Sequence, residues 1–336
     1  MKPLSFSFPL IIFFAIVFVS CARHPSQSLP MSTDTPQLLN NEVHAVVADS
    51  SMIEWIDTGI LAGGEGSGGT NFLNPVWSHD GSLVAYKYHY AIWVVNTATW
   101  ENPRKIYDGS RAKELGLYFE PSQNLVWSPD DQYLGFTLMQ YSAGDFGGEP
   151  LMAQYNLKED EVSLLLDGES GVLVDWGARG IIICLYSEFG CSVIDLSSGK
   201  RQVLGHVTSP FFVNENQIVY FDGDSILIHD LDNGHNEILD ITDNGPSGIS
   251  PVILSRSVPI ASPDAQYITW INHISRQDQS LLLYNRFNSE LLEIQNANSS
   301  LSDFGSLPGW SPDSKQFVLQ ANGTIWLAHL YSINGD

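Results

Sequence analysis

The stretch NPVWSHDGSLVAY, residues 74–86, joins a short apolar run to an alternating one through a tight turn. Asp accepts backbone N–H bonds in such turns, and Gly adopts the left-handed backbone angles they need. The motif WSPD recurs at 127–130 and 310–313, and its variants are WSHD at 77–80 and ASPD at 261–264. A motif that recurs in this way indicates a recurring structural unit.

The recurrence has a regular period. The residues that end the first predicted strand of each unit are 50, 49, 36, 49 and 49 positions apart: Trp77, Trp127, Trp176, Phe212, Ala261 and Trp310. A period of about 40–50 residues fits one four-stranded blade of a β-propeller. The segments between them are short, β-branched and aromatic, and none carries a helical stripe. We therefore predict an all-β, six-bladed β-propeller with four-stranded antiparallel blades.

The predicted third strands share a polar end. Five of them finish on Asn or Asp, at Asn96, Asn156, Asp195, Asp230 and Asn285. Such a side chain bonds backbone N–H groups at the start of a turn. The pattern therefore predicts a turn from the third to the fourth strand at each of these positions.

The last unit, residues 304–331, supplies only three strands. A spare strand, SMIEWIDTG at 51–59, lies near the N-terminus and is similar to the fourth strands of other units. We predict that 51–58 pairs with 324–331, because this pairing closes the ring and leaves no bare edge in the last blade.

Four repeats carry a family resemblance. NPVWSHDGSLVAY is joined by NLVWSPDDQYLGF (124–136), SVPIASPDAQYITW (257–270) and SLPGWSPDSKQFVL (306–319). They resemble the PDG-turn, WD40-like repeats of the TolB-like six-bladed β-propeller family, over roughly residues 50–332. Units three and four, VDWGARG and FVNENQ, lack the Ser-Pro-Asp core and are placed by spacing. TolB has a further domain before its propeller; here we expect a stand-alone propeller.

The first residues indicate export. MKPLSFSFPLIIFFAIVFVSC, residues 1–21, has one Lys, an apolar run and then small residues, as a secretory signal does. FVSC resembles the bacterial lipobox, with Phe18 in place of the usual Leu, so we predict lipidation of Cys21 and an extracytoplasmic, membrane-anchored lipoprotein. Cleavage after Ala22, which would release a secreted chain, and a retained anchor are the alternatives.

Residues 22–49 are predicted to be a flexible tether to the propeller at 50–332. Up to Asn41 this segment is rich in Pro, Ser, Thr, Gln and Asn and has no apolar period. We expect contact with the membrane through the N-terminal lipid only.

Two further cysteines, Cys184 and Cys191, lie in IIICLYSEFGCSVID, which is predicted to form a hairpin. They could face each other across the strand pair, and an oxidising compartment would permit a disulfide. Cross-strand bridges are strained, so two buried thiols are an equal alternative.

Charge and motifs limit the function. The chain has 15 Lys and Arg against 38 Asp and Glu, a formal net charge of −23, which disfavours nucleic-acid binding. We find no zinc spacing, complete Ca²⁺ loop, GxSxG motif or phosphate loop, and therefore predict no catalytic, metal or cofactor residues. The repeated Asp residues are interpreted as structural and are expected on the lower outer rim, held apart by the ring: Asp80, Asp130, Asp264 and Asp313.

The candidate binding face consists of the fourth-to-first and second-to-third strand connections. Long loops in a regular repeat are where function concentrates. Loops 109–124 and 140–150 combine basic, acidic and aromatic residues, and two later loops add arginines. The candidate residues are Arg111, Lys113, Tyr118, Tyr141, Asp145, Phe146, Glu149, Arg256 and Arg276.

We therefore expect a monomeric binding or scaffold module of the cell envelope, which recognises a protein, peptide or glycan through its loop-rich face. The competing classes are a glycan-processing enzyme, with its site at the mouth of the central channel, and a purely structural envelope component. Two or more carboxylates brought together at the channel mouth would favour the enzyme.

Overall fold

The structure is a computed structural model. It describes residues 44–47, 53–62, 75–88, 91–108, 125–139, 150–185, 190–205, 207–222, 225–239, 258–273, 279–294, 306–321 and 323–331. All of these residues belong to the compact unit Pro36–Asp336. No helix within the described ranges has the length and apolar character needed to cross a membrane.

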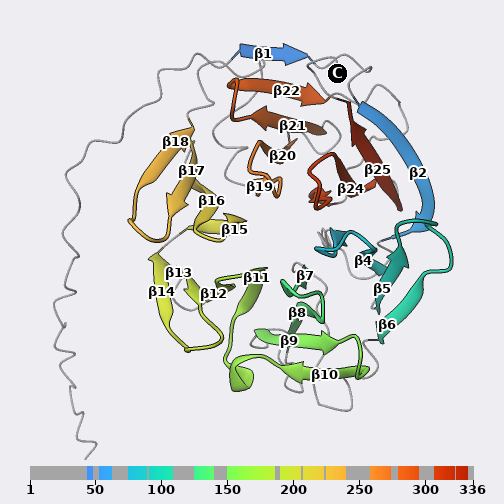
Figure 1. Cartoon of the computed structure of the whole chain (residues 1–336), viewed down its shortest axis with the longest axis vertical. Coiled ribbons are helices and arrows are strands. Elements are labelled where there is room, and N and C mark those ends of the chain that lie inside the picture. Colours follow the sequence, from blue (N-terminus) through green and yellow to red (C-terminus); the bar gives the residue numbers. More distant parts are fainter. Residues whose placement is uncertain are drawn as a thin grey trace, which may run out of the picture. The chain divides into compact units, whose positions relative to one another are not determined.

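Six sheets, which we call blades 1 to 6 in chain order, are arranged around a central channel (Figure 1). Blade 1 contains β3 (Val76–Trp77), β4 (Leu83–Tyr88), β5 (Ala91–Asn96) and β6 (Arg104–Asp108). Blade 2 contains β7 (Val126–Trp127), β8 (Tyr133–Met139), β9 (Pro150–Asn156) and β10 (Glu161–Leu164). Blade 3 contains β11 (Val172–Gly177), β12 (Gly180–Leu185), β13 (Gly190–Ile194) and β14 (Arg201–Gly205).

The other three blades repeat this order. Blade 4 contains β15 (Thr208–Asn214), β16 (Gln217–Asp222), β17 (Ser225–Asp230) and β18 (Asn236–Leu239). Blade 5 contains β19 (Ile260–Ala261), β20 (Tyr267–His273), β21 (Gln279–Asn285) and β22 (Glu290–Ile294). Blade 6 contains β23 (Gly309–Trp310), β24 (Gln316–Ala321), β25 (Thr324–Leu330) and β2 (Ile53–Leu61). One short 3-10 turn, η1 (Leu166–Gly168), follows β10. The prediction of a six-bladed propeller with four antiparallel strands per blade is confirmed.

The core lies between the blades. Middle strands such as β4 and β12 are buried on both faces, because each blade packs against two neighbours, whereas the outer strand β10 is largely exposed. The largest fully buried side chains include Trp270, Tyr155 and Phe317, which come from three different blades. Burial of these aromatic surfaces stabilises the ring as a whole.

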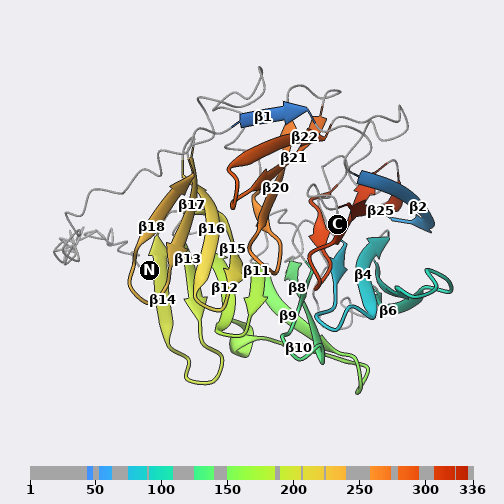
Figure 2. The same ribbon diagram turned by 45° about the horizontal axis from the view of Figure 1, so that its top comes forward.

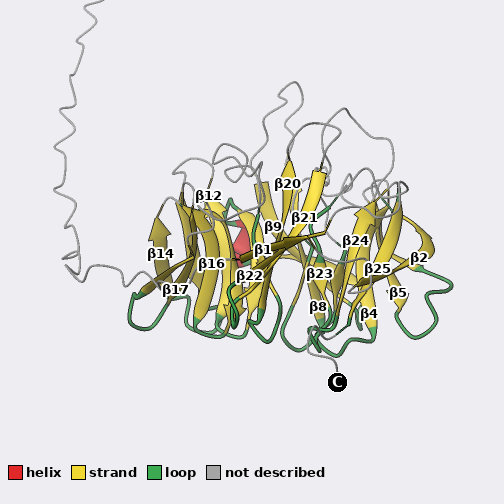
Figure 3. Cartoon of the chain, turned by 90° about the horizontal axis from the view of Figure 1, so that it is seen from above, coloured by secondary structure: helices red, strands yellow, loops and turns green. Residues whose placement is uncertain are grey.

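The predicted third-to-fourth strand turns are also confirmed. Asn96 Oδ1 accepts the N–H of Ala98 over 2.9 Å, and Asp195 Oδ1 accepts that of Ser197 over 2.8 Å. The same bond recurs at Asn156, Asp230 and Asn285. The described turns lie along one end of the blades, as Figure 3 shows.

The predicted closure of the ring is confirmed for the residues described. β2 pairs antiparallel with β25, with Ile53 opposite Leu330 and Asp57 opposite Trp326 (Figure 2). Thr58 Oγ1 donates to the carbonyl oxygen of Ile325 over 2.6 Å. The N-terminal strand therefore completes the sheet that the C-terminal strands begin.

One element is unexpected. β1 (His44–Val47) pairs in parallel with β22 at the outer edge of blade 5, and it lies within the segment 22–49 predicted to be a tether. HAVV is too short to show an apolar period, so its strand character depends on the open edge it pairs with. Together β1 and β2 attach the start of the propeller to two neighbouring blades.

Candidate functional site

The four Ser-x-Asp turns share one hydrogen-bond pattern. In blade 1, Ser78 Oγ donates to Asp80 Oδ1 over 2.7 Å and accepts the N–H of Leu83 over 3.0 Å, while Asp80 Oδ1 accepts the N–H of Ser82 over 2.8 Å. The same bonds recur at Ser128–Asp130, Ser262–Asp264 and Ser311–Asp313. Each serine is buried, so these bonds satisfy a hydroxyl group that would otherwise lack a partner.

This bonding explains the charge state of the repeated acids. The hydrogen bond from Ser78 is the main cause that lowers the pKa of Asp80, and the bond from Ser128 does the same for the pKa of Asp130. A carboxylate that accepts several hydrogen bonds is stabilised in its ionised form. The structural interpretation of these acids is supported by their geometry, because each bonds within its own turn.

The location expected for the turns needs correction. They lie beside the central channel, where His79 and Pro263 line its cavity, and not on the outer rim. The reason is that each turn begins at the innermost strand of its blade. The turns also contact one another: both oxygens of Asp131 accept backbone N–H groups, from His79 and Asp80, over 2.8 Å, and Asp264 donates its N–H to Ser314 Oγ over 3.0 Å.

The aromatic residues near the ends of the first strands pack between blades. Trp176 stacks on Tyr133 of the preceding blade, and Trp310 stacks on Tyr267 in the same way. Trp127 Nε1 donates to the carbonyl oxygen of Val76 over 3.1 Å. These contacts join neighbouring blades near the channel.

A cavity of about 340 Å³ occupies the channel at the end that carries the first-to-second strand turns. Residues of all six blades line it, most of them aromatic or aliphatic. The volume and character are those of a small-molecule site. Its titratable lining residues, within the described part of the chain, are His79, Asp175 and Glu215.

Asp175 of β11 is the acid that faces this cavity from an inner strand. Its Oδ1 accepts the N–H of Trp176 over 2.8 Å, and its Oδ2 accepts the N–H of Phe212 over 2.8 Å, which links blade 3 to blade 4. Burial among aromatic groups raises the pKa of Asp175 to about 6, and the two N–H bonds and the charge of His79 oppose this rise. Asp175 therefore holds its proton to a higher pH than an ordinary aspartate does.

His79 is held at the cavity by a second acid. Its Nδ1 lies 3.0 Å from Asp131 Oδ1, and half of its side chain is exposed. An imidazole whose Nδ1 is oriented by a carboxylate presents its other nitrogen for hydrogen bonding. The cavity thus combines an aromatic wall, an oriented imidazole and two carboxyl groups.

Sequence reasoning did not identify Asp175. A signal existed, since the position before the aligned first-strand residue of each unit is otherwise apolar or Gly: Val76, Val126, Phe211, Ile260 and Gly309. Asp175 breaks that pattern in one of the two units that lack the Ser-Pro-Asp turn. This departure from the repeat introduces an acid into the wall of the cavity.

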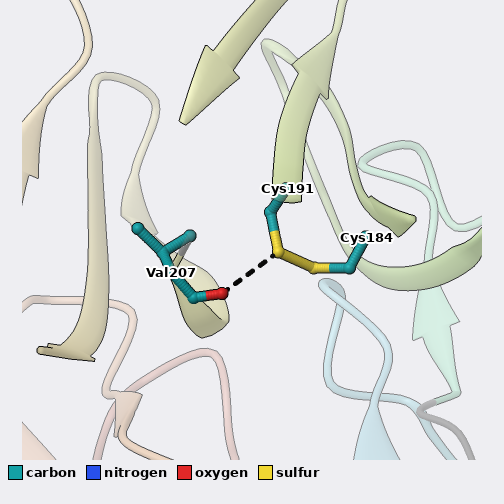
Figure 4. The surroundings of a disulfide bond; sticks show 3 residues. All are labelled: Cys184, Cys191 and Val207. Carbon is teal, nitrogen blue, oxygen red and sulfur yellow. Dashed lines mark hydrogen bonds between the residues drawn. A yellow bond between two sulfur atoms is a disulfide. The ribbon is translucent and has the colours of Figure 1, made fainter. Parts of the chain in front are cut away.

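Cys184 and Cys191 lie opposite each other in the β12–β13 hairpin and form a disulfide (Figure 4). The hairpin pairing explains why the two sulfurs meet. Cys191 Sγ also lies 3.4 Å from the carbonyl oxygen of Val207. A bridged sulfur has no proton to donate, so this approach is a packing contact between blades 3 and 4.

The predicted binding-face residues lie outside the described residues: Arg111, Lys113, Tyr118, Tyr141, Asp145, Phe146, Glu149, Arg256 and Arg276. The lipidation candidate Cys21 also lies outside them. Their convergence on one patch stays a prediction. The strands that flank these connections are described, and their antiparallel order attaches every second-to-third and fourth-to-first connection at the end of the ring opposite the cavity's turns.

No group of three or more His, Cys, Asp or Glu side chains suited to a metal ion occurs within the described ranges. The fold and this channel site define the class of the protein as a six-bladed β-propeller.

No family model and no curated protein matches the sequence, but 788 chains of solved structures are similar to it. One is a chain of the "Mitotic Checkpoint Complex", which is 12% identical with a TM-score of 0.52 and covers 97% of this chain and 99% of its own. Another is a putative TolB from Agrobacterium tumefaciens, which is 15% identical with a TM-score of 0.50 and covers 77% of this chain and 90% of its own. These similarities establish the fold, and a fold alone does not define a ligand.

Proposed function

We propose that this protein is an extracytoplasmic, lipid-anchored binding or scaffold module that recognises a protein, peptide or glycan. The observation that carries the proposal is the closed ring of six blades. In this ring the second-to-third and fourth-to-first strand connections all attach at one end. A surface assembled from many loops on a rigid scaffold is suited to recognition. We call this surface the connection face.

Two further observations support the proposal. The solved structures similar in fold include a TolB protein and a chain from a multiprotein assembly. The Cys184–Cys191 disulfide is of the kind that persists in oxidising compartments, in agreement with the signal-like residues 1–21. Attachment through Cys21 would leave the ring free to meet partners near the membrane.

Replacement of 141–149 by a Gly/Ser segment of equal length tests the connection face. The partner recovered by affinity capture from detergent-solubilised envelope should be reduced or lost. A matched replacement at the opposite end, in the turn 196–199, should leave recovery unchanged. Equal recovery from both variants and the wild type would contradict the proposal.

Attachment is tested separately by labelling cells with a radioactive fatty acid. The wild-type chain should incorporate the label and partition with membranes, and Cys21→Ala should do neither. A labelled Cys21→Ala chain, or an unlabelled wild type, would rule out the lipid anchor while leaving the connection face open to its own test.

One observation favours a second candidate function, that of a glycan-processing enzyme. Asp175 and Glu215 line the same cavity, and a carboxyl group with its pKa raised to about 6 in an apolar site is typical of a general acid. A glycan-processing enzyme needs two such groups on either side of the glycosidic bond. Hydrolysis of a glycan by the wild type, abolished in both Asp175→Asn and Glu215→Gln, would favour this candidate.

A further inference from the structure

The channel cavity is acidic, and its one basic lining group in the described residues, His79, is paired with Asp131. Its walls carry the carboxyl groups of Asp175 and Glu215, and no Lys or Arg lines it within the described part of the chain. The whole chain has a formal net charge of −23, so the surrounding field also attracts cations. A charged ligand that matches this cavity is therefore positive.

The cavity wall is rich in indole rings. Trp77, Trp127 and Trp176 are among its lining residues, and Trp77 is partly exposed there. Trp77 Nε1 is buried without a hydrogen-bond partner. Indole is the aromatic group that attracts cations most strongly, above all cations with a weakly held hydration shell. Carboxylates beside indole rings favour an organic cation over a small metal ion.

We propose that this cavity binds an organic cation, an alkylammonium or guanidinium group, with Asp175 as its main ion-pair partner. The site goes beyond the proposed function, because it lies at the end of the ring opposite the connection face. A volume of about 340 Å³ accommodates a small amine or a single basic side chain.

Asp175 retains the capacity to bind such a group. Each of its two oxygens accepts one backbone N–H, from Trp176 and from Phe212. A carboxylate oxygen accepts more than one hydrogen bond, so each oxygen retains capacity for a further donor. The two backbone bonds fix the carboxylate in place before a ligand arrives, which reduces the ordering that binding requires.

The arginine next to the lining in sequence is engaged elsewhere. Arg179 follows the lining residue Ala178, but its guanidinium group binds Asp232 over 2.7 Å and Asn216 over 3.0 Å. These partners hold the charge of Arg179 in the neighbouring surface depression and leave Asp175 unpaired by any side chain in the described ranges. An incoming cation does not have to displace a resident one.

Binding should depend on pH in one direction. The groups that titrate at the cavity are Asp175, Glu215 and His79, the last in contact with Asp131. Below about pH 6 Asp175 takes up a proton, which weakens its attraction for a cation. Affinity should rise from pH 5 to 7 and level off above.

Isothermal titration of the full chain tests the proposal. The probes are tetramethylammonium and N-acetyl-arginine methylamide, and N-acetyl-norleucine methylamide is the neutral control. Both cations should bind saturably and the neutral amide should not. Tighter binding of the arginine derivative would assign the site to a basic side chain, and tighter binding of tetramethylammonium would assign it to a small amine.

Variants locate the site. Asp175→Asn should weaken cation binding about tenfold or more, since it removes a charge-assisted partner. Asp222→Asn makes the same change at an exposed position, at the end of β16 that lies away from the cavity. This variant should bind as the wild type does. If Asp175→Asn does not fold, Glu215→Gln in the exposed turn should still lower affinity several-fold.

The proposal is overturned if neither cation binds at millimolar concentration, if the neutral amide binds equally, or if both cavity variants bind like the wild type. Loss of this site would leave the connection face untouched, because the capture experiment there uses other residues and another end of the ring.

Discussion

The residue after each repeated Asp adopts a left-handed backbone, with φ of 73° at Gly81, 55° at Asp131, 59° at Ala265 and 58° at Ser314. Glycine takes this conformation freely, whereas other residues pay about 1–2 kcal/mol for it. Three of the four turns therefore hold a strained residue, and they tolerate it because the Ser and Asp bonds on either side fix the turn.

Ala265→Gly should accordingly stabilise the protein by up to about 1 kcal/mol, since relief of the left-handed conformation outweighs the greater freedom of the unfolded chain. Both main-chain hydrogen bonds of Ala265 are retained. Its N–H donates to the carbonyl oxygen of Ser262, and its carbonyl oxygen accepts from the guanidinium group of Arg286. Urea denaturation measures the change.

The reverse substitution, Gly81→Ala, is the control. Its new Cβ would meet only Pro312, at 3.7 Å, so the backbone conformation is the cause of any effect. It should destabilise the protein by about 1 kcal/mol. An Ala265→Gly variant less stable than the wild type would contradict this account of the turn.

The raised pKa of Asp175 predicts that the unfolding free energy of the protein depends on pH. Its pKa is raised to about 6 in the folded chain from an ordinary 3.8, so the folded state holds the proton more tightly than the unfolded state. The stability that this proton contributes is present below about pH 4 and is lost as pH rises to about 6. The shift corresponds to roughly 2–3 kcal/mol.

Asp175→Asn cannot ionise and should remove this dependence. The difference in unfolding free energy between Asp175→Asn and the wild type should grow in favour of the variant from pH 4 to pH 7. Urea denaturation at several pH values measures it. A difference that stays constant, or that grows in the opposite direction, would show that Asp175 is not buried as described.

At the scale of elements, the closing strand β2 has the largest predicted effect. Deletion of 51–58 would leave β25 as an unpaired edge and expose Phe317, whose ring lies 5.7 Å from that of Trp55. The whole ring should lose stability, because a propeller with an open blade loses contacts at both neighbours. Thermal unfolding of the truncated chain should occur at a clearly lower temperature.

An unchanged melting temperature after this deletion would contradict the closure. A chain in which 332–336 is removed instead serves as the control, since those residues follow the last described strand. It should unfold at the temperature of the wild type.

The blades could be predicted from the sequence because the repeat is local. Ser128 and Asp130 occur within one turn, and their hydrogen bonds join residues that are neighbours in sequence. The closure by β2 could be inferred because the last unit lacked a strand. The channel cavity could not be predicted from the sequence. Its residues Asp175, His79 and Glu215 belong to different units and are brought together only when the ring closes. β1 was missed for a related reason, because its partner β22 is distant in sequence.

At the scale of the whole molecule, the two ends of the ring have different roles in this account. One end carries short, hydrogen-bonded turns around a cavity proposed to bind a cation. The opposite end receives the longer connections and is proposed to recognise a partner. A phenylalanine is available for comparison in each set of connections: Phe146 in the connection 140–149, which lies outside the described residues, and Phe287, 79% exposed, in the turn between β21 and β22.

Photocrosslinking in cells compares these two ends directly. A photoreactive phenylalanine analogue is placed at 146 in one chain and at 287 in another, and covalent adducts are detected after irradiation. We expect a discrete adduct from position 146 and none from position 287. An adduct from position 287 alone, or no adduct from either position, would contradict the claim that the connection face is the binding surface.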